Sequence, residues 1–145
     1  EASQNPRKVV AIRLMSNDKS GFEAEGLILV LRELGLRHGR FGVFHRLEGE
    51  EKDGAAVFSV ASLIEPGSFD LTRIKTELYP GISIFMTLPG PLSGFSSIED
   101  MMDFTRELAR RIDAYLLAEQ GGTFSIQRER YLREEIKQFE HQDLD

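Results

Sequence analysis

The sequence predicts an α+β domain in which helices cover one face of an antiparallel sheet. Extended stretches with apolar residues at every second position alternate along the chain with stretches whose apolar residues recur at helical spacing. Two of the extended stretches, residues 40–47 and 55–64, are joined only by the charged segment EGEEKDG, which is typical of an antiparallel hairpin. The chain has 145 residues, of which 41% are hydrophobic, and this suits one domain with one core.

The N-terminal part of the chain predicts a strand followed by a helix. KVVAIRLM, residues 8–15, alternates between two faces and is typical of a strand. The loop SNDKSGFE closes with an expected capping box made by Ser20 and Glu23. We expect the helix to run from there to about Leu34, where Gly35 ends it.

The middle of the chain predicts the hairpin and one further strand. After the hairpin, EPGSFDLTRIKTELYPG is irregular, with one helical turn expected after Asp70. GISIFMTLPG, residues 81–90, follows as a strand that Pro89 ends.

The C-terminal part predicts a helix, a short strand and a last helix. A second capping box, Ser96 with Glu99, is expected to start the first of these helices, and AYLLA is the strand. Ser125 is expected to cap the last helix. The residues that repeat at helical spacing are Ile98, Met101, Thr105, Leu108 and Ile112 in the first helix, and Leu132, Ile136 and Phe139 in the second.

The ends of the chain are polar and suggest segments outside the domain. EASQNPRK has the composition of the cut end of a linker. We therefore expect residues 1–6 to be a disordered linker remnant, residues 7–140 to form the domain, and residues 141–145 to be a flexible tail.

Composition and motifs argue against several classes of function. The net charge of −6 weakens a case for non-specific binding to nucleic acid or to an anionic membrane. Without cysteine there is no disulfide framework and no thiolate site, and no apolar run is long enough to span a bilayer. The three histidines, His38, His45 and His141, lack metal-ligand spacing, and GPLSG lacks the Lys of a phosphate loop. We expect no enzyme, no metal and no cofactor.

The predicted strands carry apolar residues on both faces, and Phe85 makes the second face conspicuous. The face expected under the helices consists of Val10, Ile12, Leu14, Phe44, Phe58, Val60, Ile64, Ile82, Ile84, Met86 and Leu88. The opposite parity, which we call the open face, consists of Ala11, Arg13, Met15, Phe41, Val43, His45, Ser59, Ala61, Leu63, Ser83, Phe85 and Thr87. A sheet face in water should be polar, so this concentration of apolar groups predicts a binding surface with Phe85 as an anchor.

Other arrangements of the open face stay possible on the residues alone. A loop or the polar tail that folds over it would bury these groups within the molecule, and a homodimer would bury them between copies. Exposed Phe41 and Phe85 on an antiparallel sheet also fit a single-stranded RNA-binding module, although such a face should be ringed with basic residues. A small-molecule regulatory domain would need converging polar groups.

Five ordered segments resemble one known family. They are RKVVAIRLM, GRFGVFHR, AVFSVASLIEPGSFD, YPGISIFMTLPG and REEIKQFE. Together they are similar to the C-terminal domain of ZipA, the bacterial cell-division protein that binds the tubulin-like FtsZ, and the likeness covers nearly all of residues 7–140. FSVASLIEPGSFD followed by PGISIFM is its most specific part.

The resemblance implies a six-stranded antiparallel sheet with three helices on one face and a shallow apolar groove for the FtsZ C-terminal peptide on the other. The positions that match the family's groove are Ala11, Arg13, Phe41, Val43, Ala61, Leu63 and Phe85, to which the face pattern adds Met15, Ser83 and Thr87. Arg13 stands where relatives carry an aliphatic residue, and Glu65 where a basic residue occurs. These two differences bear on which charges in the peptide the groove prefers.

The implied function is a non-enzymatic adaptor that ties the division filament to the inner membrane during septum assembly. Family members carry an N-terminal membrane anchor and a long linker. We accordingly expect this domain to make no direct membrane contact, to act at the cytoplasmic face of the inner membrane, to bind no nucleic acid and to be a monomer in isolation.

Overall fold

A computed structural model describes residues 6–49 and 54–144 of the chain. Its strands are β1 (Lys8–Ser16), β2 (Phe22–Glu23), β3 (Arg37–His38), β4 (Phe44–Leu47), β5 (Ala56–Ser62), β6 (Leu78–Tyr79), β7 (Gly81–Leu88) and β8 (Ala114–Ala118). Its α-helices are α1 (Ala24–Glu33), α2 (Gly94–Ile112) and α3 (Ile126–Leu144), and η2 (Arg40–Gly42) and η3 (Leu71–Arg73) are 3₁₀ turns. The predicted linker remnant, except Pro6, and the centre of the hairpin connection lie outside the described residues.

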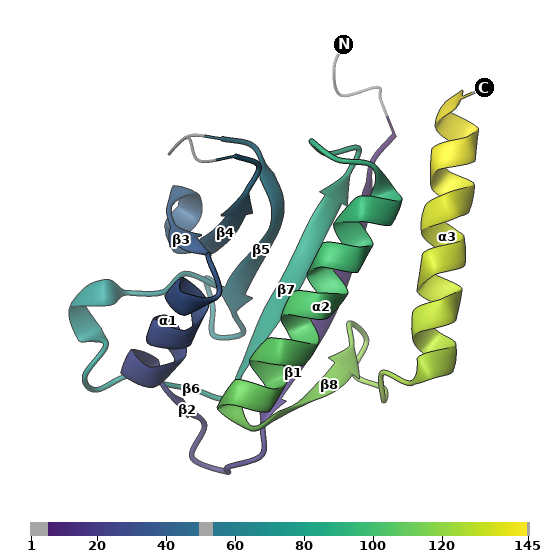
Figure 1. The fold of residues 1–145 in the computed structure, drawn as a ribbon. Helices are drawn as coiled ribbons and strands as arrows, with labels where there is room; N and C mark the ends of the chain where they lie inside the picture. Colours follow the sequence, from purple (N-terminus) through teal and green to yellow (C-terminus); the bar gives the residue numbers. More distant parts are fainter. Residues whose placement is uncertain (1–5, 50–53, 145) are drawn as a thin grey trace.

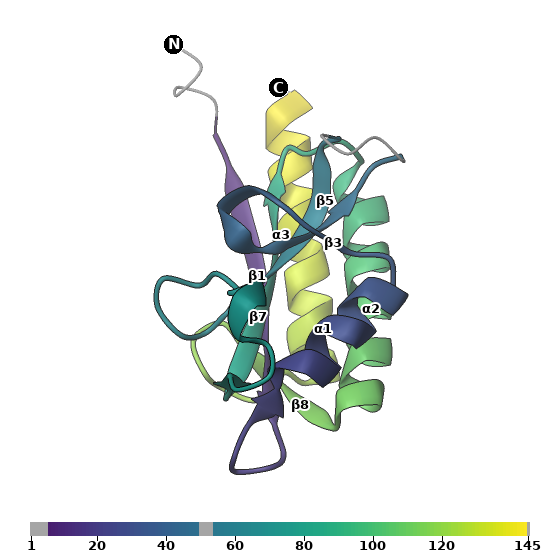
Figure 2. The same cartoon turned by 90° about the vertical axis from the view of Figure 1, so that its left-hand side faces the viewer.

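Six strands form one antiparallel sheet in the order β3-β4-β5-β7-β1-β8, and β2 pairs separately with β6. Within the described part of the chain, the three α-helices lie on the same side of this sheet (Figures 1 and 2). The predicted α+β class, with a six-stranded antiparallel sheet and three helices, is confirmed. The long strands β1 and β7 are adjacent, and each supplies a continuous apolar row to the core.

The side chains under the helices form the core, as the alternation predicts. Ten of the eleven expected residues are at most 2% exposed, and they are Val10, Ile12, Leu14, Phe44, Phe58, Val60, Ile82, Ile84, Met86 and Leu88. Removing each such side chain from water contributes about 1.5–3 kcal/mol before entropic costs. The prediction for Ile64 is wrong, because β5 ends at Ser62 and the chain bends away, which leaves Ile64 41% exposed.

Two of the predicted helix starts are wrong, because α1 starts after the expected cap Ser20 and α2 starts before the expected cap Ser96. Ser20 bonds Asp18 instead, through its hydroxyl at 2.8 Å, and the next residues enter the β2–β6 pair, so that α1 begins at Ala24. In α2 the cap is Ser93, whose hydroxyl accepts the backbone N–H of Ser96 at 3.1 Å.

The predictions for Ser125, Gly35, the turn after Asp70 and the AYLLA strand agree with the structure. Ser125 accepts the N–H of Arg128 at 3.0 Å and so caps α3, and Asp70 caps the short turn η3 in the same way. Gly35 follows α1 with φ of 95°, a left-handed conformation that glycine adopts without steric cost, and the β8 strand lies where AYLLA predicts it.

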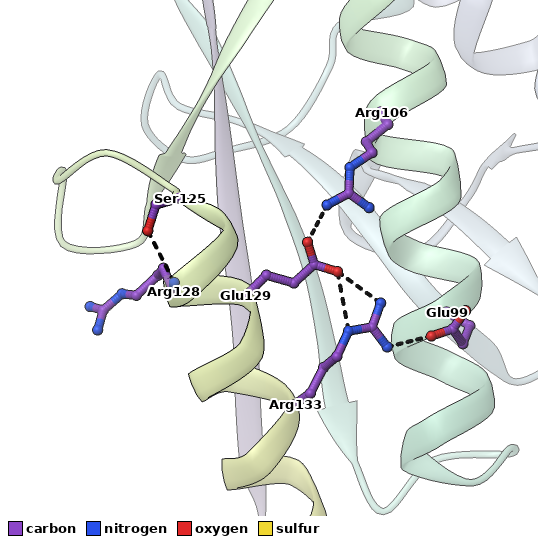
Figure 3. Close-up of polar contacts among 6 residues, drawn as sticks. All are labelled: Glu99, Arg106, Ser125, Arg128, Glu129 and Arg133. Carbon is purple, nitrogen blue, oxygen red and sulfur yellow. Dashed lines mark hydrogen bonds and ion pairs between the residues drawn. The ribbon is translucent and has the colours of Figure 1, made fainter.

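Helix α3 is held against α2 by an ionic cluster as well as by apolar packing. Glu129 accepts hydrogen bonds from Arg133 at 2.8 and 3.1 Å, and Arg106 of α2 donates to its other oxygen (Figure 3). Arg133 also donates to Glu99 of α2. Burial alone would raise the pKa of Glu129, but the hydrogen bonds from the two arginines outweigh it and hold that pKa below its ordinary value.

Candidate functional site

The strand register assembles the open face into three rows that run across the sheet and one shorter pair, Val9 with Thr87. Because opposed residues of paired strands point to the same side, the register fixes which side chains are neighbours. The rows are His45, Ser59, Phe85 and Ala11; then Ala61, Ser83, Arg13 and Leu117; then Leu63, Gly81, Met15 and Tyr115.

The apolar members of these rows are separate from the core. Met15, Leu63 and Phe85 are only partly buried, and none of the three belongs to the core cluster or packs against it. On the same strands, Leu14, Ile82 and Ile84 are fully buried in that cluster. One face of the sheet is therefore buried under the helices, and the apolar side chains of the other face remain partly accessible to solvent.

Gly81 forms a low point on the open face between two apolar side chains. A Cβ at this position would lie 2.6 Å from Met15 Sδ and 2.8 Å from Leu63 Cδ1, far inside van der Waals contact. The missing side chain lets Met15 from β1 and Leu63 from the end of β5 approach each other over the backbone of β7. Phe85 stands four residues further along the same strand and on the same side.

One end of the open face is covered by the turn η2. His45 Nε2 lies 3.1 Å from the carbonyl oxygen of Arg40 in that turn, and His45 Nδ1 lies 2.7 Å from the hydroxyl of Ser59. Both His45 and Ser59 are consequently buried, and so is Val43. A loop does fold over the open face at its β4 end.

The assignment of Phe41 and Val43 to a strand is wrong. Phe41 has φ of 62° and ψ of 13°, a left-handed conformation that no strand residue adopts, and β4 begins only at Phe44. The carbonyl of the next residue, Gly42, accepts the N–H of Phe69 at 2.7 Å, which anchors the turn to the segment after β5. Phe41 is 88% exposed at this turn, whereas Val43 is buried.

Arg13 is the charged residue at the centre of the open face. It is partly buried and lies opposite Ser83 on β7 and Leu117 on β8. Within the described residues, its guanidinium makes no hydrogen bond and no ion pair. An unpaired, partly desolvated guanidinium is a strong donor for a carboxylate.

Three residues of the open face were missed from the sequence. Tyr115 and Leu117 reach it from β8, and Val9 reaches it from the start of β1; Tyr115 is 44% exposed and Val9 57%. Val9 has the parity of Ala11, so the signal for it was present. The β8 residues carried none, because the partner of that short strand cannot be read from its own sequence.

The structure holds little that supports chemistry of another kind. Within the described ranges, no group of three or more acidic, histidine or cysteine side chains is arranged to hold a metal ion. His38 is engaged by the carbonyl oxygens of Gly42 and Phe69, both at 3.1 Å, and thus has a structural role. No helix in this part of the chain is long and apolar enough to cross a membrane.

Comparisons with known proteins agree on one family. Residues 8–135 match the family model described as ZipA, C-terminal FtsZ-binding domain. Proteins named cell division protein ZipA from Xanthomonas axonopodis pv. citri and from Stutzerimonas stutzeri are 29% and 31% identical to the chain over 97% and 94% of its length. The chain spans only 58% and 50% of the length of these two relatives.

Proposed function

The chain belongs to the family of ZipA C-terminal FtsZ-binding domains, and on that premise we propose that its open face binds the C-terminal tail peptide of FtsZ. The family is one of cell-division adaptors rather than enzymes. The observation that carries the proposal is the set of partly accessible apolar side chains outside the core, among them Met15, Leu63 and Phe85. Such a set on a helix-free sheet face is typical of a surface that is completed by a partner.

The residues proposed to contact the tail are those of the uncovered part of the open face. They are Ala11, Arg13, Met15, Ala61, Leu63, Ser83, Phe85 and Thr87, to which the structure adds Val9, Tyr115 and Leu117. Phe41 is proposed as a contact at the rim because it is so exposed. Val43 is buried, so its proposed part is to support η2 rather than to touch the peptide.

The proposed tail is a short segment that orders when it binds. A disordered segment loses conformational entropy on the surface, so a modest affinity is expected despite the apolar contacts. The unpaired guanidinium of Arg13 favours a tail with a carboxylate opposite the centre of the sheet. Residues 7–140 are proposed to be the binding unit, acting as a monomer.

The proposed role of the whole protein is to tie FtsZ filaments to the inner membrane during septum assembly. The relatives are longer than this chain, and the membrane anchor is proposed to lie in a part of the protein that precedes it. In this arrangement the domain itself binds FtsZ and makes no contact with lipid or nucleic acid.

A titration with a synthetic FtsZ C-terminal peptide tests the proposal. We expect the backbone amide signals of β1, β5 and β7 to shift on addition of the peptide in a two-dimensional NMR experiment. The variant Phe85→Ala should weaken binding, while Leu29→Ala, which removes an exposed apolar side chain from the helical side, should not. Shifts confined to the helices, or no shifts at millimolar peptide, would overturn the proposal.

A further inference from the structure

The outer edge of β1 is covered along only part of its length. The register of β1 with β8 runs from Ser16 to Ile12, where β8 ends at Ala118. Residues Lys8–Ala11 therefore have β7 on one side and, within the described part of the chain, no strand on the other. Figure 1 shows the short strand β8 beside the lower part of β1, and helix α3 on the side of β8 that faces away from β1.

Two hydrogen bonds show which backbone groups of β1 point to this edge. The N–H of Ser16 donates to Pro80 on the β7 side at 3.1 Å, and the N–H of Asn17 donates to Asp113 on the β8 side at 3.1 Å. Because these directions alternate along a strand, the odd-numbered residues point away from β7. Val9 thus directs both its N–H and its C=O to the uncovered edge, and Ala11, beside the end of β8, directs its N–H there.

A cavity lies against these backbone groups. Its volume is about 250 Å³, and it lies between the edge of β1 and helix α3. Its apolar lining comes from Val9, Val10, Ala11, Ala118, Phe124, Tyr131 and Leu132. Val9 and Tyr131 are 57% and 60% exposed, so the site is open to a partner.

We propose that the FtsZ tail, after crossing the open face, adds an extended segment to the sheet along the Val9–Ala11 edge of β1. The inference rests on the proposed function and names a second way in which the same partner is held. Unpaired donors and acceptors at a two-residue spacing are complementary to an extended main chain and not to a helix. The side chains of Val9 and Ala11 belong to the open face, so a tail bound there reaches this edge without a gap.

The added segment continues the sheet in the line of β8. Its main chain forms up to three hydrogen bonds with the two groups of Val9 and the N–H of Ala11, and its side chains alternate between the open face and the cavity beside α3. The ion pair between Lys8 and Glu135, 3.5 Å apart, joins β1 to α3 at the same cavity.

Amide hydrogen exchange on the domain, with and without the synthetic FtsZ C-terminal peptide, tests this inference. We expect the Val9 and Ala11 amides to exchange at least tenfold more slowly when peptide is bound. The Val10 and Ile12 amides are matched controls, because they already face β7 and should be protected in both samples.

The outcomes separate this inference from the proposed function. If the peptide shifts β5 and β7 signals while the Val9 and Ala11 amides exchange unchanged, the edge proposal fails and the open-face proposal stands. If the peptide produces no shifts, both fail. If the two amides become protected at high domain concentration without peptide, a second copy of the chain occupies the edge and the proposal is overturned.

A proline variant supplies a second measurement. Val9→Pro removes the outward N–H and leaves the hydrogen bonds to β7, and proline is tolerated near the start of an edge-facing strand. We expect peptide affinity to fall about tenfold more in Val9→Pro than in Val9→Ala, which keeps the N–H, with both variants folded by circular dichroism. Equal affinities for the two variants would contradict the inference.

Discussion

Ile84 and Phe85 are neighbours on β7, yet they belong to opposite regions of the molecule. Ile84 is fully buried among helices, whereas Phe85 lies partly exposed in a row with Ala11 and Ser59. The apolar side chains of the covered face are buried against the helices of the same chain. Those of the open face are not, and this difference supports the proposal that its apolar residues serve an intermolecular contact rather than stability.

The largest expected effect is on the covered face. Ile84→Ala should lower the free energy of unfolding by about 2–5 kcal/mol, because it removes buried methylenes and leaves a cavity. Urea denaturation measures this, and Ser83→Ala, on the same strand but on the open face, is the control that should change stability by less than about 0.5 kcal/mol. The folded fraction of Ile84→Ala should still bind the peptide. Similar losses of stability in both variants would mean that the two faces do not differ as described.

The next largest effect is on the open face, where a substitution should weaken peptide binding more than it lowers stability. Phe85→Ala should weaken binding of the FtsZ tail peptide by about 2 kcal/mol or more, roughly thirtyfold, because it removes an apolar anchor at the centre of the open face. Its cost in stability should be smaller than that of Ile84→Ala, because the ring keeps accessible area and lies outside the core cluster. Thermal melts measure the stability of both variants, and peptide titrations measure their affinities. If Phe85→Ala unfolds the domain as readily as Ile84→Ala, Phe85 is a core residue and the open face has a structural purpose.

The regular parts of the fold were predictable because local pattern and tertiary packing agree there. β1 and β7 alternate over their whole length, and nearly every residue expected under the helices is buried. The capping boxes at Ser20 and Ser96 failed for different reasons: the hydroxyl of Ser20 donates to Asp18 and the chain then enters the β2–β6 pair, whereas Ser93 caps α2 three residues before Ser96. A four-residue pattern carries no information about such competitors.

The sequence predicts which residues of one strand belong to the candidate site, but not which strands lie next to each other in it. Parity selects Arg13, Leu63 and Phe85 correctly as residues outside the core, since each follows the strand's two-residue period. The same argument fails at Phe41, where a left-handed residue interrupts the period. It also omits Tyr115, because the pairing of β8 with β1 is a contact between residues a hundred positions apart and is not encoded locally.

A smaller effect concerns charge on the open face. Arg13→Gln should weaken peptide binding by about 0.5–1 kcal/mol at low salt, because it removes a cation available to a carboxylate of the tail. The difference from wild type should shrink as salt screens the pair, and stability should not change, since Arg13 has no ion pair within the described residues to lose.

The control for Arg13 is a cation on the helical side. Arg32→Gln removes an exposed positive charge from α1 and should leave peptide affinity unchanged at every salt concentration. Isothermal titration at 50 mM and at 500 mM salt, concentrations chosen to span the Debye screening range of about 14 to 4 Å, measures both variants. The prediction is wrong if Arg13→Gln binds the peptide as tightly as wild type at low salt, or if Arg32→Gln loses as much affinity as Arg13→Gln. In either case the guanidinium of Arg13 does not contact a charge of the tail.

An effect no larger than that of Arg13→Gln, and on stability rather than on binding, is expected at the ionic cluster that fixes α3 on the helical side. Arg133 and Arg106 hold the pKa of Glu129 below its ordinary value of 4.5, so the folded state binds that proton less readily than the unfolded state. The resulting stabilisation is present above the ordinary pKa and is lost as pH falls through the lower pKa of the folded protein. Glu129→Gln should therefore lose up to about 1 kcal/mol of stability at pH 7 and progressively less relative to wild type below pH 4. Urea denaturation across this range measures the difference, with Glu134→Gln, an exposed residue of the same helix, as the control.

Because the cluster lies on the helical side of the sheet, Glu129→Gln should bind the peptide as wild type does at pH 7. A loss of affinity at that pH would mean that the two faces are coupled through α3.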